Sequence, residues 1–161
     1  MPGSSASVGV VLSIEAVFNG LETLLEAVTG FAAASVTQND YTALNKGVSK
    51  AMVIRYGGSV DGERGLNGTV DMTHIALVEV YERYKNPADT ENDLRDDTQL
   101  ITTRIHQYPK LNGVSGMQWA FVRGITETEP PHSELVNQPN RWRMRTVEIE
   151  MREHDTQAYL E

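Results

Sequence analysis

The sequence contains no cysteine among its 161 residues, and it has no apolar run long enough to cross a bilayer. The absence of cysteine excludes disulfide bonds and thiolate metal sites. It therefore gives no indication of whether the protein works in an oxidising or a reducing compartment. Basic residues are also scarce, because 14 lysines and arginines face 22 aspartates and glutamates and give a formal net charge of −8. This balance disfavours broad wrapping of nucleic acid, which requires a basic surface.

The length of 161 residues predicts one domain that can bury an independent core. Residues 1–8 are small and polar, so we expect a flexible N-terminal arm there and a single domain over residues 9–161. No positively charged region precedes the first apolar stretch, which predicts a soluble protein made without a signal peptide.

The strongest periodic signal is the segment from Val10 to Val28. Its apolar residues recur at alternating steps of three and four, while Asn19 and three glutamates occupy the opposite side. A period of about 3.6 residues places the two sets on opposite faces of an amphipathic helix, and the polar face excludes a membrane span. The apolar stripe comprises Val11, Ile14, Phe18, Leu21, Leu25 and Val28.

Four later segments have the alternation or the β-branched composition of strands, and one has the periodicity of a second helix. The segment Phe31–Asn45 is ambiguous between helix and turn. Two pairs of strands separated by a helix predict the α+β class, with a mixed or antiparallel sheet of about four strands and the two main helices packed on one face. The strands are predicted at Lys50–Tyr56, Met72–Tyr84, Met117–Glu127 and Arg141–Arg152, and the helix at Asp89–Tyr108.

Two segments are predicted to be long loops. Gly57–Asp71 contains five glycines, which favours a flexible hairpin tip, and Thr128–Asn140 contains three prolines. In the last strand the apolar alternation changes phase between Met144 and Val147. This change predicts a bulge or a strong twist near Arg145–Thr146.

The glycine-rich segment has part of the spacing of a phosphate-binding loop. Such a loop requires GxxxxGK followed by serine or threonine, because the lysine and the hydroxyl group contact phosphates and magnesium. Gly57 and Gly62 have this spacing, but Glu63 and Arg64 replace the lysine and the hydroxyl residue. An acidic side chain at that point repels phosphate, so the pattern favours a plain hairpin.

The sequence has no strong catalytic or metal-binding pattern. The four histidines lack the HxxxH or HxH spacing that places two imidazoles on one face of a helix or strand. An alternative metal site assembled across the sheet would use Asp71, His74 and His106. We therefore predict no enzyme activity, no cofactor and no bound metal. The carboxylates of the second helix are expected on a solvated acidic face; they are Glu91, Asp93, Asp96 and Asp97.

Arg141, Arg143 and Arg145 form the one local concentration of positive charge. On a strand they point to a single face. One interpretation is an edge strand protected by charge, or ion pairs with acidic residues of an adjacent strand. The other interpretation is a subunit interface, in which the arginines pair with carboxylates of the next copy.

The order of these segments carries a resemblance to a known family. The N-terminal amphipathic helix is followed by a strand that ends in the glycine-rich VIRYGGSVDG, and then by the long strand HIALVEVYERY. A helix with an acidic start (DTENDLRDDTQLITTRIHQY), a strand with tryptophan (MQWAFVRGITETEP) and a closing strand (RWRMRTVEIEMRE) follow. The arrangement covers roughly residues 8–154 and resembles the tail-terminator and tail-completion proteins of long-tailed bacteriophages. Related neck proteins of the head-to-tail joint share it in part.

The resemblance implies a structural protein of the virion tail, assembled in the host cytoplasm as a ring on the end of the tail tube. Such rings are usually hexameric, stop growth of the tube and present a surface to the head-tail connector protein. The implied partners are further copies of the chain, the tail tube protein and the connector, with no membrane. DNA would pass through the lumen without specific binding, and the family has no active site to transfer.

A ring closed by head-to-tail contacts needs two different patches on each subunit. Alternatives from other classes are a small metal- or nucleotide-dependent enzyme, and a monomeric adaptor that binds one partner through the two long loops. The candidate interface residues are Arg141, Arg143 and Arg145 in the last strand, Gly58, Asp61, Glu63 and Arg64 in the glycine-rich loop, and Asp93, Asp96 and Asp97 in the second helix.

Overall fold

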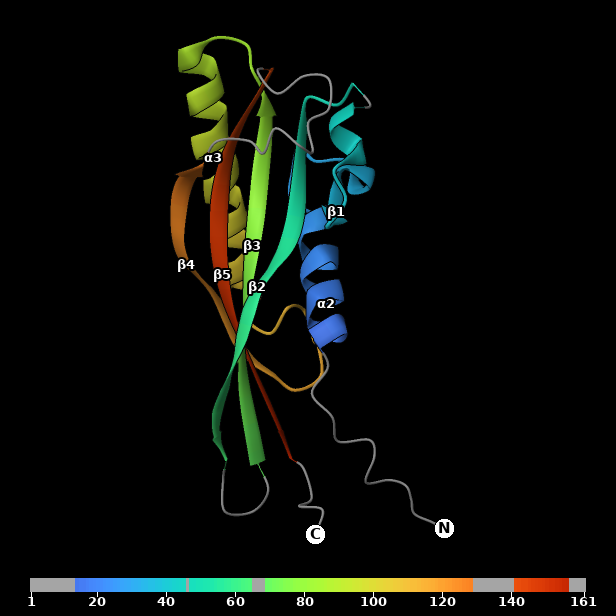
Figure 1. Ribbon diagram of the computed structural model, residues 1–161, viewed down its shortest axis with the longest axis vertical. Helices are drawn as coiled ribbons and strands as arrows, with labels where there is room; N and C mark the ends of the chain where they lie inside the picture. Colours follow the sequence, from blue (N-terminus) through green and yellow to red (C-terminus); the bar gives the residue numbers. More distant parts are fainter. Residues whose placement is uncertain (1–13, 46, 65–68, 129–140, 157–161) are drawn as a thin grey trace.

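The computed structural model of the chain describes residues 14–45, 47–64, 69–128 and 141–156 (Figure 1). None of the described helices is long and apolar enough to cross a membrane. In chain order the elements are α2 (Ile14–Glu26), the 3₁₀ helix η1 (Ala33–Ser35), β1 (Val36–Gln38), the 3₁₀ helix η2 (Thr42–Asn45), β2 (Lys50–Arg64), β3 (Thr69–Arg83), α3 (Pro87–Gln107), β4 (Met117–Thr128) and β5 (Trp142–Thr156).

The five described strands form one mixed sheet in the order β1-β2-β3-β5-β4 (Figure 1). β1 runs parallel to β2, and the other neighbouring pairs are antiparallel. The predicted α+β class and mixed sheet are therefore confirmed. The fifth strand is β1, which comes from the segment that the sequence left ambiguous.

Both helices occur where the periodicity predicts them. α2 is confirmed from Ile14 to Glu26. The residues predicted to be helical before Ile14, and the N-terminal segment 1–8 that was predicted to be flexible, lie outside the described residues. α3 begins at Pro87, slightly before the predicted start, because the Asn86 side chain accepts a hydrogen bond from the backbone N–H of Asp89 at 2.9 Å. This cap satisfies a donor of the first turn, where proline is also favoured.

The loop predicted at Gly57–Asp71 is wrong at residues 57–64 and 69–71, because β2 continues to Arg64 and β3 begins at Thr69, while residues 65–68 lie outside the described residues. The two strands pair antiparallel, as a hairpin requires. Figure 1 shows the ends of β2, β3 and β5 extending beyond α2 and β4 as a narrow arm. Pairing with β3, which β5 supports on its other side, overrides the low strand propensity of glycine. The second predicted loop, Thr128–Asn140, lies outside the described residues except for its first residue, which ends β4.

Glycine allows β2 to pass through a bulge at the base of the arm. The register with β3 shifts between Tyr56 and Gly58. Gly58 has a φ of 115°, a conformation that other residues rarely adopt. A Cβ at Gly57 would lie 3.0 Å from Ile75 Cγ2 and 3.1 Å from the carbonyl oxygen of Ile75, which is tighter than most Cβ contacts. The glycines therefore serve a bulged strand instead of a loop.

The bulge predicted near Arg145–Thr146 is also wrong, since β5 pairs with β3 without a break through these residues. The phase change has another cause. Met144 and Val147 face opposite sides of the sheet, and each side carries its own apolar cluster. A straight strand buried on different faces along its length produces the same sequence pattern as a bulge.

The larger cluster joins buried side chains of α2, α3 and the sheet, and the smaller cluster lies on the other face of the sheet near η2. α2 contributes Val17, Phe18, Leu21, Leu24 and Leu25 to the larger cluster, α3 contributes Leu94, Ile101 and Ile105, and the smaller cluster contains Ala43, Leu44, Ala51, Val53, Tyr81, Trp142 and Met144.

The substitution Leu21→Ala tests whether α2 belongs to the core. Leu21 is fully buried in the larger cluster, so its truncation is expected to lower the free energy of unfolding by about 2–5 kcal/mol. Urea unfolding followed by circular dichroism measures this change. Glu15→Ala, at an exposed position of the same helix, is the matched control and is expected to change it by less than about 0.5 kcal/mol. Equal effects of the two substitutions would contradict a core role for α2.

Candidate interaction surfaces

Arg143 and Arg145 lie on β5, which pairs with β3 on one side and with β4 on the other. The interpretation of an edge strand protected by charge is therefore wrong at Arg145, which pairs with Glu127 of β4, whereas Arg143 lies just beyond the last described pair of β4 and β5, Thr128 with Met144. Arg145 is neutralised within the subunit: its Nη1 lies 3.1 Å from Glu127 Oε2 on β4, and its Nη2 donates a hydrogen bond to Glu91 on α3. Ion pairing with an adjacent strand is thus confirmed for this residue.

Arg143 and Arg141 have different surroundings from Arg145, since both side chains are exposed. The Arg143 guanidinium stacks on the Tyr84 ring at 4.5 Å, and its Nη1 donates to the carbonyl oxygen of Trp142 at 3.1 Å. Among the described residues no carboxylate forms an ion pair with Arg143. Arg143 therefore stays a candidate for contact with another chain.

The acidic residues of α3 do not share one environment. Asp96 is exposed and lies 3.1 Å from Nη2 of the neighbouring Arg95, while the half-buried Asp93 lies 2.8 Å from Lys85 Nζ. These are surface ion pairs, and such pairs contribute little to stability.

Asp97 belongs instead to a buried charged cluster. It is only 3% exposed, and Lys50 Nζ donates to its two carboxylate oxygens at 3.1 and 3.3 Å. The prediction of a solvated acidic face is wrong for Asp97, because its position falls three and four residues from the buried Leu94 and Ile101 and so lies on the same side of the helix.

Glu82 on β3 completes this cluster. It is 2% exposed, and its Oε2 has no hydrogen-bond partner among the described residues. Burial, together with the hydrogen bond and the charge of Asp97, raises the pKa of Glu82 to about 8 against the lowering effect of Lys50. The carboxyl group therefore retains its proton at neutral pH, so that the cluster holds one carboxylate and one ammonium group.

The four candidate residues of the glycine-rich segment lie on β2. Gly58 follows the first register shift, and Asp61 and Arg64 flank a second one. The side chains of Asp61, Glu63 and Arg64 are outside the described part of the structure. In Figure 1 the arm and the start of α3 lie at opposite ends of the molecule, so the structure does not bring these residues together with the acidic residues of α3.

A row of polar side chains crosses the base of the arm, from the exposed Tyr56 to the buried His74 and Glu153. Ser59 Oγ lies 2.6 Å from His74 Nδ1, and His74 Nε2 lies 2.5 Å from Glu153 Oε2. The Tyr56 hydroxyl donates to Ser59 Oγ at 2.7 Å. This is the hydroxyl–imidazole–carboxylate order of nucleophilic enzymes, but His74 is 0% exposed and the serine contacts Nδ1. The row therefore satisfies buried polar groups and ties β2, β3 and β5 together.

The alternative metal site is not assembled. Asp71 and His74 lie three residues apart on β3 and so point to opposite faces of the sheet. Asp71 accepts hydrogen bonds from His154 and Arg152, and these hold the pKa of Asp71 below its usual range. His106 accepts a hydrogen bond from the backbone of β4. Within the described residues no group of three potential metal ligands occurs.

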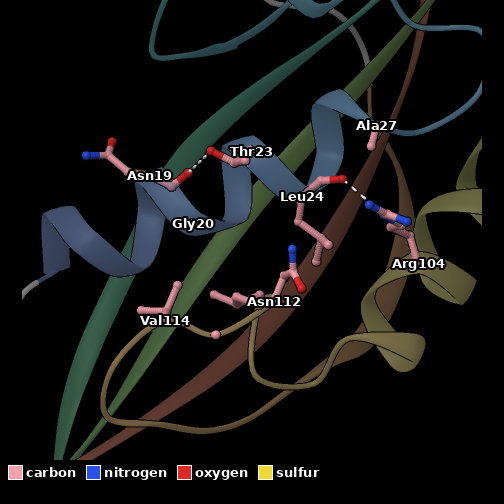
Figure 2. Close-up of a pocket in the computed structure, with 10 residues that line it drawn as sticks. Asn19, Gly20, Thr23, Leu24, Ala27, Arg104, Asn112 and Val114 are labelled. Carbon is pink, nitrogen blue, oxygen red and sulfur yellow. Dashed lines mark hydrogen bonds between the residues drawn. The ribbon is translucent and has the colours of Figure 1, made fainter.

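Sequence reasoning missed a groove between α2 and the turn that follows α3 (Figure 2). Its volume is about 460 Å³, and none of the predicted site residues lines it. Glycine at position 20 allows the two walls to approach closely, because a Cβ there would lie only 2.3 Å from Val114 Cγ2. The available signal was Asn112-Gly113, a turn dipeptide directly after a predicted helix.

No protein-family model matches the chain, and no curated protein matches its sequence. Solved structures do match its fold. Among them is the sheath/tube terminator of an extracellular contractile injection system, PVC, in its extended state, determined by cryo-EM. That match has a TM-score of 0.54 and 12% sequence identity, and it covers 92% of this chain and 58% of that chain. The described fold is therefore similar to that of a terminator.

The raised pKa of Glu82 predicts a pH-dependent stability. Because the folded-state pKa, about 8, exceeds the ordinary value of 4.5, the stabilisation is fully present below about pH 4.5 and is lost as the pH rises through about 8. Each unit of pKa difference corresponds to about 1.4 kcal/mol. Glu82→Gln cannot ionise, so the substitution is expected to remove this loss.

Urea unfolding at a series of pH values from about 5 to about 9 measures the effect, because this range covers most of the interval between the two pKa values. The stability of the Glu82→Gln variant relative to the unsubstituted chain is expected to rise with pH up to about 8 and then to level off. Glu15→Gln, at an exposed position, is the control and is expected to give a curve parallel to that of the unsubstituted chain. A parallel curve for Glu82→Gln would show that Glu82 ionises normally in the folded protein.

Proposed function

We propose that this chain is a structural protein of a tail-like assembly and that it closes the end of the tube as a ring of identical subunits. The observation that carries the proposal is the likeness of its fold, across 92% of the chain, to a sheath/tube terminator. In a virus tail the ring would stop growth of the tube and join it to the head connector. Its partners would be its own copies, the tube protein and the connector, and assembly would take place in the host cytoplasm.

Exposed apolar side chains on two separate strands support self-association. β1 pairs only with residues 52–54 of β2, and beyond them β2 exposes Tyr56 and Val60, which are 50% and 66% exposed. β4 exposes Phe121 and Ile125, which are 39% and 45% exposed. β2 and β4 lie on opposite sides of the central pair β3 and β5. The two residues of each strand pair with residues of opposite faces of the sheet, so each strand is exposed on both faces. Two different contact surfaces are what a ring closed by head-to-tail contacts requires.

The distribution of charge is also consistent with a ring around DNA. A net charge of −8 repels phosphates, so DNA could slide through a lumen without binding to it. Arg143 is an exposed guanidinium that no described carboxylate neutralises, and an arginine of this kind can pair with a carboxylate of the next copy.

Native mass spectrometry of the chain, alone and with isolated tail tubes, tests the proposal. A closed ring is expected, with a mass of several subunits, and Arg143→Glu is expected to weaken it while circular dichroism shows the monomer folded. Lys110→Glu changes the charge by the same amount at another exposed position and is expected to leave assembly unchanged. A protein that stays monomeric at high concentration and also fails to bind tail tubes would contradict the proposal.

A further inference from the structure

The groove in Figure 2 has one charged lining residue, Arg104 of α3. Its apolar lining comes from Leu24 of α2 and from Leu111 and Val114 of the turn, and its polar lining from side chains that include Asn112. A volume of about 460 Å³ falls within the range of small ligand sites, roughly 300–1,000 Å³. The groove can therefore hold a short peptide segment.

Arg104 is held in place but is not neutralised. Its Nε donates to the backbone oxygen of Leu24 at 3.2 Å, and its guanidinium lies over the Tyr108 ring at 4.5 Å. One of the five N–H donors of the guanidinium makes that bond. None of the described carboxylates forms an ion pair with Arg104, whereas five other arginines of the described structure do form such pairs. The group is thus positioned, with donors left for a ligand.

The wall opposite α2 has a strained backbone. Leu111, Asn112 and Gly113 follow one another with φ values of 51°, 57° and 97°. The left-handed region is unfavourable for leucine, and strain of this kind concentrates at binding sites. The side chain of Leu111 is buried, which fixes the turn and places Asn112 in the lining of the groove.

We infer that this groove binds a segment of a partner protein that presents a carboxylate beside an apolar side chain. The carboxylate pairs with Arg104, whose planar guanidinium matches it in a two-bond contact. The apolar side chain lies against Leu24 and Val114, and the amide of Asn112 bonds to the peptide backbone. A single arginine with a half-apolar lining suits a carboxylate better than a phosphate, which recruits several cations or N–H groups. The inference holds whether or not the chain forms a ring.

Methyl NMR spectroscopy of the full chain, labelled at leucine and valine, tests this inference even in a large assembly. The probe is N-acetyl-leucine, and its matched control is N-acetyl-leucinamide, which lacks the carboxylate. The methyl signals of Leu24, Leu111 and Val114 are expected to shift and to saturate with the acid, and the acid is expected to bind about tenfold or more tightly than the amide. Equal binding of both, no saturable shift, or preferential binding of inorganic phosphate would overturn the inference.

Two variants distinguish a loss of binding in the groove from a loss of folding. Arg104→Gln removes the charge and is expected to lower the affinity for N-acetyl-leucine to that for the amide. Asn112→Gly suits the positive φ at this position and leaves Arg104 in place, so the variant is expected to remain folded while its affinity falls. Unchanged affinity in a folded Arg104→Gln variant, or in Asn112→Gly if the first fails to fold, would contradict the inference.

Discussion

The pairing of β3 on both of its sides is the constraint on which the fold depends. β3 pairs with β5 from Thr69 to Arg83 and with β2 along most of the same length. Its two faces are buried as well, with Val78 in the larger apolar cluster and Tyr81 in the smaller one. A strand enclosed in this way fixes the register of its neighbours, because a slip by one residue would reverse every side chain. The arm is a consequence of this pairing, because β2 and β5 remain paired with β3 beyond the ends of the helices.

The sequence predicted the elements whose signal is local and failed where the cause is distant. Steps of three and four residues predicted α2 and α3, and alternation predicted the strands, because each pattern reports the burial of one element. Gly57 and Gly58 favour a loop when considered alone, but the stability of the hairpin comes from β3 and β5, which lie later in the chain. The phase change between Met144 and Val147 likewise required knowledge of a second cluster on the other face of the sheet.

The candidate interface could be predicted only as a set of residue types, because the partners of charged groups are remote in sequence. Asp97 pairs with Lys50, which is 47 residues away, and Arg145 pairs with Glu91, which is 54 residues away. No local pattern separates these residues from the exposed Arg143. The burial of His74 was easier to predict from the sequence. His74 is in phase with Ala76 and Val78, which lie on the face of β3 that packs in the larger cluster.

These satisfied charges limit what can drive association between copies. Arg145 and Asp97 have partners within the subunit, so recruiting either to a neighbour would first break an existing pair. Ion pairs at an exposed surface contribute about 0–1 kcal/mol each, which is too little to close a ring. Burial of the apolar side chains on β2 and β4 contributes more, at roughly 25 cal/mol for each Å² removed from water. In the proposed ring the apolar strands therefore supply most of the affinity, while Arg143 fixes the orientation of neighbouring copies.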